Sequence, residues 1–485
     1  MTRVFFITSL LAFCIAICML PSLLLSFYYA DGATKGFATS IIATSILSLI
    51  FAYPCRKESK SLSQQRALLT VGLCWVITCV VGALPFVFSG QLHFTDALFE
   101  SVSGFTTTGA SIFPNVEIVP KSLIFWRSCS HWLGGMGIVV LSLAIFSLLG
   151  VGGMQLYKAE VSGYTPDRLA PTLRETAALL WQVYLAMTLV LFALLWIGGM
   201  NWFDAINHTF ATVATGGFST RNASLAAFPS PFIQWTIIIF MFLSGINFAL
   251  HLRFLRGDFS CFRKNEECRM YTYIVLFAII CISLNLWLKG ILPGKDFFEW
   301  EEIIRVTAFQ VVSVITTTGF ASTDYSLWPS FALGILLFIA FIGGSAGSTA
   351  GGFKVMRLQI LTSFTLIENF RFLHPRLIRP IKLNNQTVTP TIITAILSYF
   401  LIFLALLIIS TLILLACSLD LETAFTASLA CIANVGPGLG EVGPVNNYGH
   451  LPYLAKWVLT LAMLLGRLEV YAVFAIFMPS LWRGK

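Results

Sequence analysis

The sequence predicts an all-α integral membrane protein, and its composition, its long apolar segments and a repeated short motif all indicate that class. Of the 485 residues, 57% are hydrophobic and only 11% are charged, and the mean hydropathy is +0.84. So few polar residues cannot cover a chain of this length in water. The chain is therefore expected to lie in a lipid bilayer.

Ten long segments run almost free of charge, and each has the about 20 residues that a helix needs to cross the hydrocarbon core. We expect one transmembrane helix from each of residues 4–30, 36–55, 67–95, 128–157, 176–203, 222–252, 270–288, 325–353, 383–419 and 457–482. The first segment follows Arg3, as in a secretion signal. It is too long for one, has no small-x-small cleavage site and leads into a second span, so we expect a retained anchor.

Four shorter charge-free segments carry a glycine-containing motif. They cover residues 101–116, 205–220, 306–323 and 423–440, and their motifs are GFTTTGA, VATGGF, VITTTGF and IANVGPG. The motif glycines are Gly109, Gly217, Gly319 and Gly436, at intervals of 108, 102 and 117 residues. Segments of 16 to 18 residues with an internal turn are poor spans and favour re-entrant helices. Four capped helix ends at the membrane surface are the alternative interpretation.

The motifs belong to an internal repeat. Residues 96–111 align without a gap with residues 204–219, which matches Gly109 to Gly217. The chain then divides into a two-span preface (1–66) and four channel-like units (67–157, 158–252, 253–382 and 383–485). Parallel repeats of this kind surround an axis along the membrane normal. We therefore expect ten transmembrane helices and four re-entrant pore helices, arranged as four pseudo-symmetric units around one pore.

The loop charges predict the orientation. Of the 30 Lys and Arg residues, 21 lie on the side that contains both termini and residues 56–66, 158–175, 253–269 and 354–382. Eight lie on the opposite side, and Arg467 lies within a span. Cytoplasmic loops collect Lys and Arg, so the termini are expected in the cytoplasm and the glycine motifs toward the outside. The net charge of +8 follows from this bias and requires no nucleic-acid partner.

Acidic residues gather near the outer ends of the motif segments. They are Asp96, Glu100, Asp204, Glu299, Glu301, Glu302, Asp420 and Glu422. Carboxylates at the mouth of a pore would raise the local concentration of cations. Alternatively, the same carboxylates stabilise helix N-termini.

The motifs predict a cation filter built from the backbone. Glycine allows the positive φ that turns successive carbonyls inward, and rings of carbonyls replace the water of a large, loosely hydrated ion such as potassium. The expected ligands are the carbonyls of each glycine and of the two residues before it: Thr107, Thr108, Gly109, Thr215, Gly216, Gly217, Thr317, Thr318, Gly319, Asn434, Val435 and Gly436. A calcium or magnesium path would show a ring of carboxylates, and none falls in register.

These residues resemble the Trk/Ktr/HKT superfamily of potassium transporters, most closely its bacterial TrkH and TrkG membrane subunits. The resemblance covers essentially the whole chain and is carried by TTTGA, GGMGIVVL, GVGGMQLYKAE, TGGFST, TTTGF, GGSAGSTAGGFKVMR, NVGPGLGEV and GRLEVY. It implies a pore of four non-identical units with one filter glycine each, and potassium contacts from the two residues before each glycine. Thr215 stands where such proteins often carry a bulkier apolar residue, which a backbone contact should tolerate.

The resemblance also implies partners and a location. It indicates potassium transport in the bacterial cytoplasmic (inner) membrane, a homodimer, and a separate TrkA-like cytosolic ring that binds nucleotides. That ring would dock on the basic residues of 158–175, 253–269 and 354–382, because the chain itself shows no nucleotide site. The bound cofactor is then the transported potassium ion, with no organic cofactor, and lipid surrounds the protein. Passive flux and proton-coupled symport both remain open.

A glycine-rich segment predicts a gate. Residues 343–352 (GGSAGSTAGG) interrupt an apolar segment with Gly343, Gly344, Gly347, Gly351 and Gly352, and such a composition is a poor helix former. Irregular backbone at membrane depth must line water or pack on protein, so we expect it beneath the filter. A small-residue helix-packing face is the alternative.

Arg467 is expected to act with that segment. A buried Arg costs roughly 2.5–3.5 kcal/mol on insertion scales and requires a partner. Glu469 projects to another face, so the carbonyls of residues 343–352 are the better candidates, as the resemblance also implies. Arg467 could instead reach the membrane surface or pair elsewhere.

Two other function classes are weaker. An intramembrane enzyme would need a catalytic cluster, but His131, His208 and His251 stand singly and no HExxH occurs. A sodium- or proton-coupled carrier of another solute would need a pocket at broken helices, which four channel-like turns fit poorly. The 11 cysteines have no metal-ligand spacing, and Cys261 and Cys268 fall in an expected cytoplasmic loop, so no disulfide is implied.

Overall fold

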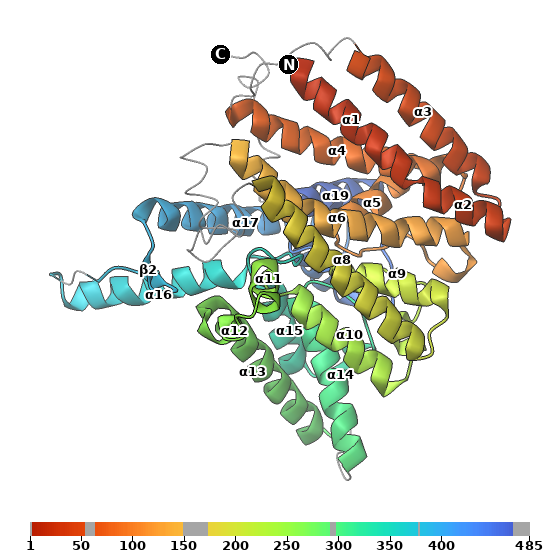
Figure 1. Cartoon of the computed structure of the whole chain (residues 1–485). Helices are drawn as coiled ribbons and strands as arrows, with labels where there is room; N and C mark the ends of the chain where they lie inside the picture. The colour runs from red at the N-terminus through yellow and green to blue at the C-terminus, as the bar shows by residue number, and fades with distance from the viewer. Residues whose placement is uncertain (1, 54–63, 149–172, 292–296, 377–378, 469–485) are drawn as a thin grey trace.

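The computed structural model describes residues 2–53, 64–148, 173–291, 297–376 and 379–468, and α-helices dominate it (Figure 1). One group of helices comprises α1 (Thr2–Cys18), α2 (Leu20–Tyr29), α3 (Thr34–Ala52), α4 (Gln64–Phe88), α6 (Lys121–Leu148), α8 (Leu173–Ile197), α10 (Pro231–Ser244), α13 (Glu266–Leu288), α14 (Phe297–Ile315), α15 (Ser330–Ile342), α16 (Val355–Leu373), α17 (Pro390–Ala416) and α19 (Tyr453–Arg467). The remaining elements are α5 (Phe94–Phe105), η2 (Val116–Ile118), α9 (Trp202–Val213), η3 (Ser224–Ala227), α11 (Phe248–Leu255), α12 (Cys261–Lys264), η4 (Tyr325–Leu327), α18 (Leu421–Ile432), η5 (Gly440–Val442), β1 (Lys382–Leu383) and β2 (Gln386–Thr387).

Several helices can cross a membrane. Within the described residues, six segments have the length and hydropathy of a span: Val4–Tyr29, Thr34–Ala52, Leu68–Phe88, Glu175–Ile197, Glu266–Leu288 and Pro390–Ala416. The pair α10 and α11 adds a seventh if it is counted as one bent span. The chain is thus a multi-pass membrane protein, while the total of ten spans stays a prediction.

The expected span over residues 222–252 is not one straight helix. It contains η3 and α10, and then bends by 101° into α11. The break falls at Gly245, where α10 ends, and the Asn247 side chain restarts the helix by accepting a hydrogen bond from Ala249 N (2.9 Å). The residues around Gly245 form a long apolar run, so the sequence pattern did not indicate this bend.

The expected span over residues 383–419 begins later than predicted, at Pro390. Residues 382–387 form an antiparallel hairpin of β1 and β2. Its two turn residues, Asn384 and Asn385, have φ of +48° and +63°, the conformation that Asn tolerates in tight hairpins. Asn384 and Glu266 exchange two backbone-to-side-chain hydrogen bonds, of 2.8 and 2.9 Å, which tie the hairpin to the start of α13. Figure 1 shows α16 projecting from the body toward these strands.

The interruption expected in residues 325–353 is present. After η4, helix α15 ends at Ile342 and α16 begins at Val355, with irregular backbone between them. Three hydrogen bonds, from Phe353, Lys354 and Val355 to residues 341, 342 and 344, close the two ends of this stretch on each other. We call residues 343–352 the intramembrane loop.

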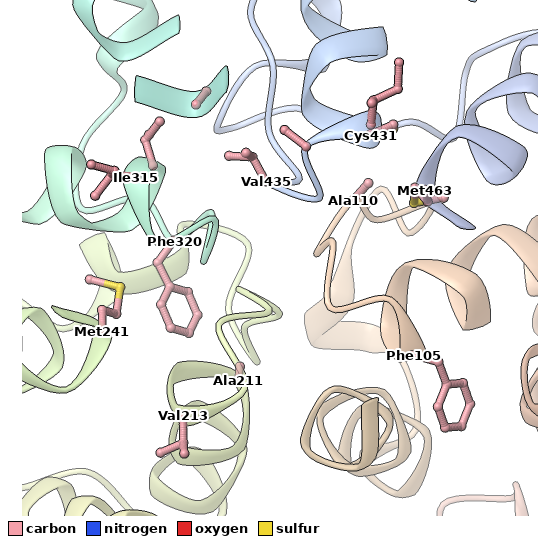
Figure 2. Close-up of a cluster of buried hydrophobic side chains, with 14 of the residues drawn as sticks. Phe105, Ala110, Ala211, Val213, Met241, Ile315, Phe320, Cys431, Val435 and Met463 are labelled. Carbon is pink, nitrogen blue, oxygen red and sulfur yellow. The ribbon is translucent and has the colours of Figure 1, made fainter. Parts of the chain in front are cut away.

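The core contains four 12- to 19-residue helices, α5, α9, α14 and α18, which we call the pore helices. Contacts between the four predicted units run α6 to α9, α10 to α14, α15 to α18 and α19 to α5, so that the last predicted unit contacts the first. Figure 2 draws buried side chains from all four units, among them Ala110, Ala211, Phe320 and Val435, around one central region. Residues far apart in the sequence thereby meet at one place.

Candidate ion-conducting site

The four pore helices end in the same way. In each, the second residue after the helix is left-handed, with φ between 54° and 56°: Thr107, Thr215, Thr317 and Asn434. The next N–H then bonds five residues back, at 2.8–2.9 Å: Thr108 to Ser103, Gly216 to Ala211, Thr318 to Ser313 and Val435 to Ala430. This is a Schellman ending, which normally uses glycine at the left-handed position. Threonine is rare there, and such strain is typical of functional sites.

The four motif glycines form a closed cycle of contacts. Each has a positive φ, between 79° and 98°. A Cβ at each glycine would lie within 3.0 Å of a carbonyl oxygen in the next turn: Gly109 against Gly216, Gly217 against Thr318, Gly319 against Val435, and Gly436 against Thr108. The fourth contact returns to the first turn, so the four turns surround one axis. Both the backbone conformation and the neighbouring carbonyl require glycine here.

The ring offers backbone oxygen and no ionised side chain. The predicted ligand positions carry Thr, Gly, Asn and Val, and the residues before the glycines are buried. Among the described residues, no group of three or more His, Cys, Asp or Glu is placed to hold a metal ion. The pore helices direct their C-terminal ends, the negative ends of their dipoles, toward the ring. Such a site suits a monovalent cation that exchanges water for carbonyls.

The intramembrane loop lies against the pore-helix ends. Gly351 N donates to Thr317 Oγ1 (2.7 Å), and Thr349 Oγ1 donates to the carbonyl of Val213 (3.1 Å) at the end of α9. A Cβ at Gly351 would also lie within 3.0 Å of the carbonyl oxygen of Ala433, after α18. The loop therefore contacts three of the four pore-helix ends directly.

The bend between α10 and α11 holds the other side of the loop. Ser345 N donates to Gly245 O (2.9 Å), and Phe248 N donates to Gly347 O (3.0 Å). Positive φ values at Gly343, Gly347 and Gly352 shape the loop. Gly343 and Gly352 touch each other so closely that neither site has room for a Cβ. Gly344 packs near Ala350.

Arg467 contacts this loop, as the sequence indicates. Its side chain is 6% exposed, and Nη1 donates to the carbonyl of Thr349 at 2.8 Å. The contact joins the end of α19 to the loop between α15 and α16, 118 residues away in the sequence. Glu469, the rejected partner, lies outside the described residues.

Several of the acidic residues are engaged by protein groups. Asp96, Asp204, Glu299 and Glu422 lie in the first turns of the four pore helices, and Asp420 caps α18. Lys456 binds Asp96 (2.7 Å), and Arg221 binds Asp204 (2.7 Å). Glu100 is buried against Arg127 at 2.6 Å. These positions favour the helix-terminus interpretation over a free acidic mouth.

Three further side chains contact the ring or the helix bend, and the sequence does not predict these contacts. His131 is buried, and its ring stacks on Phe218 with centroids 4.0 Å apart, filling the space that a Gly216 side chain would need. His251 Nε2 bonds to Leu243 O (2.9 Å) at the helix bend. Tyr448 OH donates to the carbonyl of the motif glycine Gly436 (2.7 Å). The available signal was a polar residue inside an expected span, which applies to His131 and His251 but not to Tyr448.

Comparison with known proteins identifies the family. A family model named TrkH and described as a cation transport protein matches residues 33–483. The chain belongs to the TrkH family.

Named relatives of this TrkH-family chain agree along nearly its whole length. It is 40% identical over 465 residues to the Trk system potassium uptake protein TrkH of Escherichia coli K12, covering 95% of each chain. It is 31% identical over 470 residues to TrkG of the same organism, covering 96% of this chain and 95% of TrkG. The crystal structure of the potassium transporter TrkH from Vibrio parahaemolyticus matches with a TM-score of 0.89 and 35% identity, covering 99% of both chains.

Proposed function

We propose that this protein takes up potassium across the bacterial cytoplasmic membrane through the central ring. The observation that carries the proposal is the closed cycle in which each motif glycine abuts the carbonyl of the next turn. The names of the relatives, all of them potassium uptake proteins, support the choice of ion.

The proposed filter uses main-chain oxygens. Potassium loses its water at modest cost when carbonyls replace it, whereas smaller sodium holds its water more strongly. The ligands would be the carbonyls of the glycines and of the two residues before each one, from Thr107 to Gly436. The absence of ionised side chains at these positions favours a monovalent ion, and the four helix dipoles stabilise it.

The proposed gate consists of the intramembrane loop and Arg467. The loop blocks the inner side of the ring, and the bond from Arg467 to Thr349 O supports this closed arrangement. Opening requires the loop to leave the pore-helix ends. Its glycines at positive φ give the backbone the freedom to rearrange.

The proposed orientation places the glycine ring toward the outside and both termini in the cytoplasm, following the bias in Lys and Arg. A cytosolic nucleotide-binding ring would then dock on residues 253–269 and 354–382, where basic side chains such as Arg256, Lys264 and Arg371 are exposed. The basic residues of 158–172 and 56–63 lie outside the described residues. A homodimer in the lipid bilayer is part of the same proposal.

Ion flux in liposomes tests the function. Purified protein is reconstituted, and the fluxes of potassium, rubidium, sodium and lithium are compared with and without a proton gradient. Potassium and rubidium flux well above that of sodium and lithium is expected, and Gly217→Ala should abolish it. A flux that requires the proton gradient would indicate symport. Equal flux of all four ions would reject the filter, and transport only of an organic solute would favour the carrier alternative.

A further inference from the structure

Equivalent positions in three pore helices carry three different polar side chains. Nine residues before the motif glycines Gly109, Gly217 and Gly319 stand Glu100, His208 and Gln310, and each is 0–1% exposed. Each side chain contacts a serine just beyond its own filter turn: Glu100 contacts Ser111, His208 contacts Ser219 and Gln310 contacts Ser322. The pattern repeats with the pseudo-symmetry of the units, although the residues differ.

Glu100 makes the most extensive of these contacts. Its carboxylate accepts from Ile112 N (2.7 Å), Ser111 Oγ (3.3 Å) and Arg127 Nε (2.6 Å). Arg127 also donates to Ser111 Oγ at 3.0 Å and lies over the ring of Phe218 at 4.0 Å. The buried Glu100–Arg127 pair thus holds Ser111 and Ile112, which follow the first turn. It also contacts Phe218, which follows the second motif glycine.

His208 makes the same connection without a charged partner. Its Nδ1 lies 2.8 Å from the backbone carbonyl of Asp204, so Nδ1 carries the hydrogen and Nε2 accepts from Ser219 Oγ at 2.9 Å. Ser219 Oγ in turn accepts from Arg221 N (3.0 Å). The imidazole also packs against Phe320, the residue after the third motif glycine, with ring centroids 5.8 Å apart.

Gln310 and the fourth unit complete the set. Gln310 Nε2 donates to Ser322 Oγ at 3.2 Å. In the fourth unit the equivalent residue is Ala427, and its neighbour Thr426 accepts from Leu439 N through Oγ1 at 2.9 Å. Every pore helix therefore holds the chain beyond its own filter turn through a buried side chain.

We propose that Glu100, His208 and Gln310 are positioning residues that fix the outer leg of each filter turn, and that the ion preference of the ring depends on them. The number, field strength and spacing of the carbonyls in a ring set its preference among ions, and all three depend on how the turns are held. The turns themselves are strained at Thr107, Thr215 and Thr317, so they need outside support to hold their shape. This inference rests on the proposed function of the ring as a potassium filter.

His208 is the best position for a test, because it is uncharged and Gln310 shows which side chain can replace it. His208→Leu keeps the volume and removes the contact with Ser219. His208→Gln restores an amide that can bond to Ser219, as Gln310 bonds to Ser322. Thr209→Val is the matched control, since Thr209 is the next residue of α9, is fully buried, and its Oγ1 has no hydrogen-bond partner among the described residues.

The measurement is the ratio of potassium to sodium flux in liposomes, together with the melting temperature of each purified variant. His208→Leu is expected to lower the ratio roughly tenfold, the factor that corresponds to about 1.4 kcal/mol, the size of one buried hydrogen bond. His208→Gln and Thr209→Val should keep the ratio within about twofold. Ser219→Ala should resemble His208→Leu, and the double variant should be no worse than either single one.

The outcomes separate the two proposals. A wild-type protein that does not prefer potassium would overturn the filter, and this inference with it. A selective wild type with an equally selective His208→Leu variant overturns the inference alone. The same applies if His208→Gln loses as much selectivity as His208→Leu, because side-chain shape and not the bond to Ser219 would then be responsible.

Discussion

The hydroxyl of Thr317 accepts a hydrogen bond from the backbone N–H of Gly351, at 2.7 Å. Thr317 is the left-handed residue of the third glycine turn, and Gly351 belongs to the intramembrane loop. The other threonines at the equivalent position lack this link: Thr215 Oγ1 bonds to the carbonyl of its neighbour Ala214. In the third turn, the side chain of the left-handed residue itself therefore binds the intramembrane loop.

Replacing Thr317 by Val removes that acceptor and keeps the branched side chain. Because the closed loop loses a hydrogen bond worth about 0.5–1.5 kcal/mol, we expect potassium flux to rise roughly two- to tenfold. The potassium flux of reconstituted liposomes, compared between the variant and the wild-type protein, measures this rise. Thr107→Val is the matched control, with nearly the same φ and an Oγ1 that has no hydrogen-bond partner among the described residues. An equal rise in both variants would contradict a specific link to the loop.

Gly217→Ala should stop conduction. A Cβ there meets the carbonyl oxygen of Thr318, and the left-handed backbone adds about 1–2 kcal/mol of strain. We expect potassium flux to fall at least about tenfold. Gly334→Ala on α15, where a Cβ meets nothing within 4 Å, should conduct normally, and Gly199→Ala tests positive φ alone in open space. Normal flux through Gly217→Ala would show that the ring is not the path.

Removing Arg467 should open the path. Arg467→Ala loses the bond to Thr349 O, and deletion of residues 343–352 removes the loop itself, so both changes are expected to raise potassium flux. Leu461→Ala, on the same helix but 43% exposed, is the control and should leave flux unchanged. Unchanged flux in both the Arg467→Ala and deletion variants would rule out the gate.

The Glu100–Arg127 pair should matter for stability. Both side chains are almost fully buried, and removing one partner leaves an uncompensated charge. Arg127→Met is therefore expected to destabilise the fold by about 3–5 kcal/mol, read as a lower melting temperature in detergent. Arg371→Met breaks an exposed pair with Glu368 and should change stability by about 1 kcal/mol or less. Equal melting temperatures for the two variants would argue against a buried charge pair.

The sequence predicts features that depend on local chemistry. The four glycine turns and the interruption at residues 343–352 follow from residues that disfavour regular helix, and the structure places them where local signals indicate. The partner of Arg467 among the loop carbonyls was also predicted, since a buried guanidinium needs acceptors. Whether these residues conduct and gate stays a prediction.

Features that depend on distant partners could not be predicted in the same way. Lys456 and Asp96 are 360 residues apart, and nothing near Asp96 indicates that a lysine neutralises it. The bend at Gly245 lies inside a long apolar run, and the distant loop that packs against it gives no signal near Gly245. By contrast, the pair Asn384 and Asn385 is itself a turn signal, but the strongly hydrophobic segment after it dominates the sequence pattern.

All four turns of the ring come from a single polypeptide, so a mutation in one codon changes one turn and leaves the other three as they are. In an assembly of identical subunits the same mutation would appear in every turn at once. A single chain can therefore carry turns that differ, and this one does, because Asn434 stands where the other three turns have threonine.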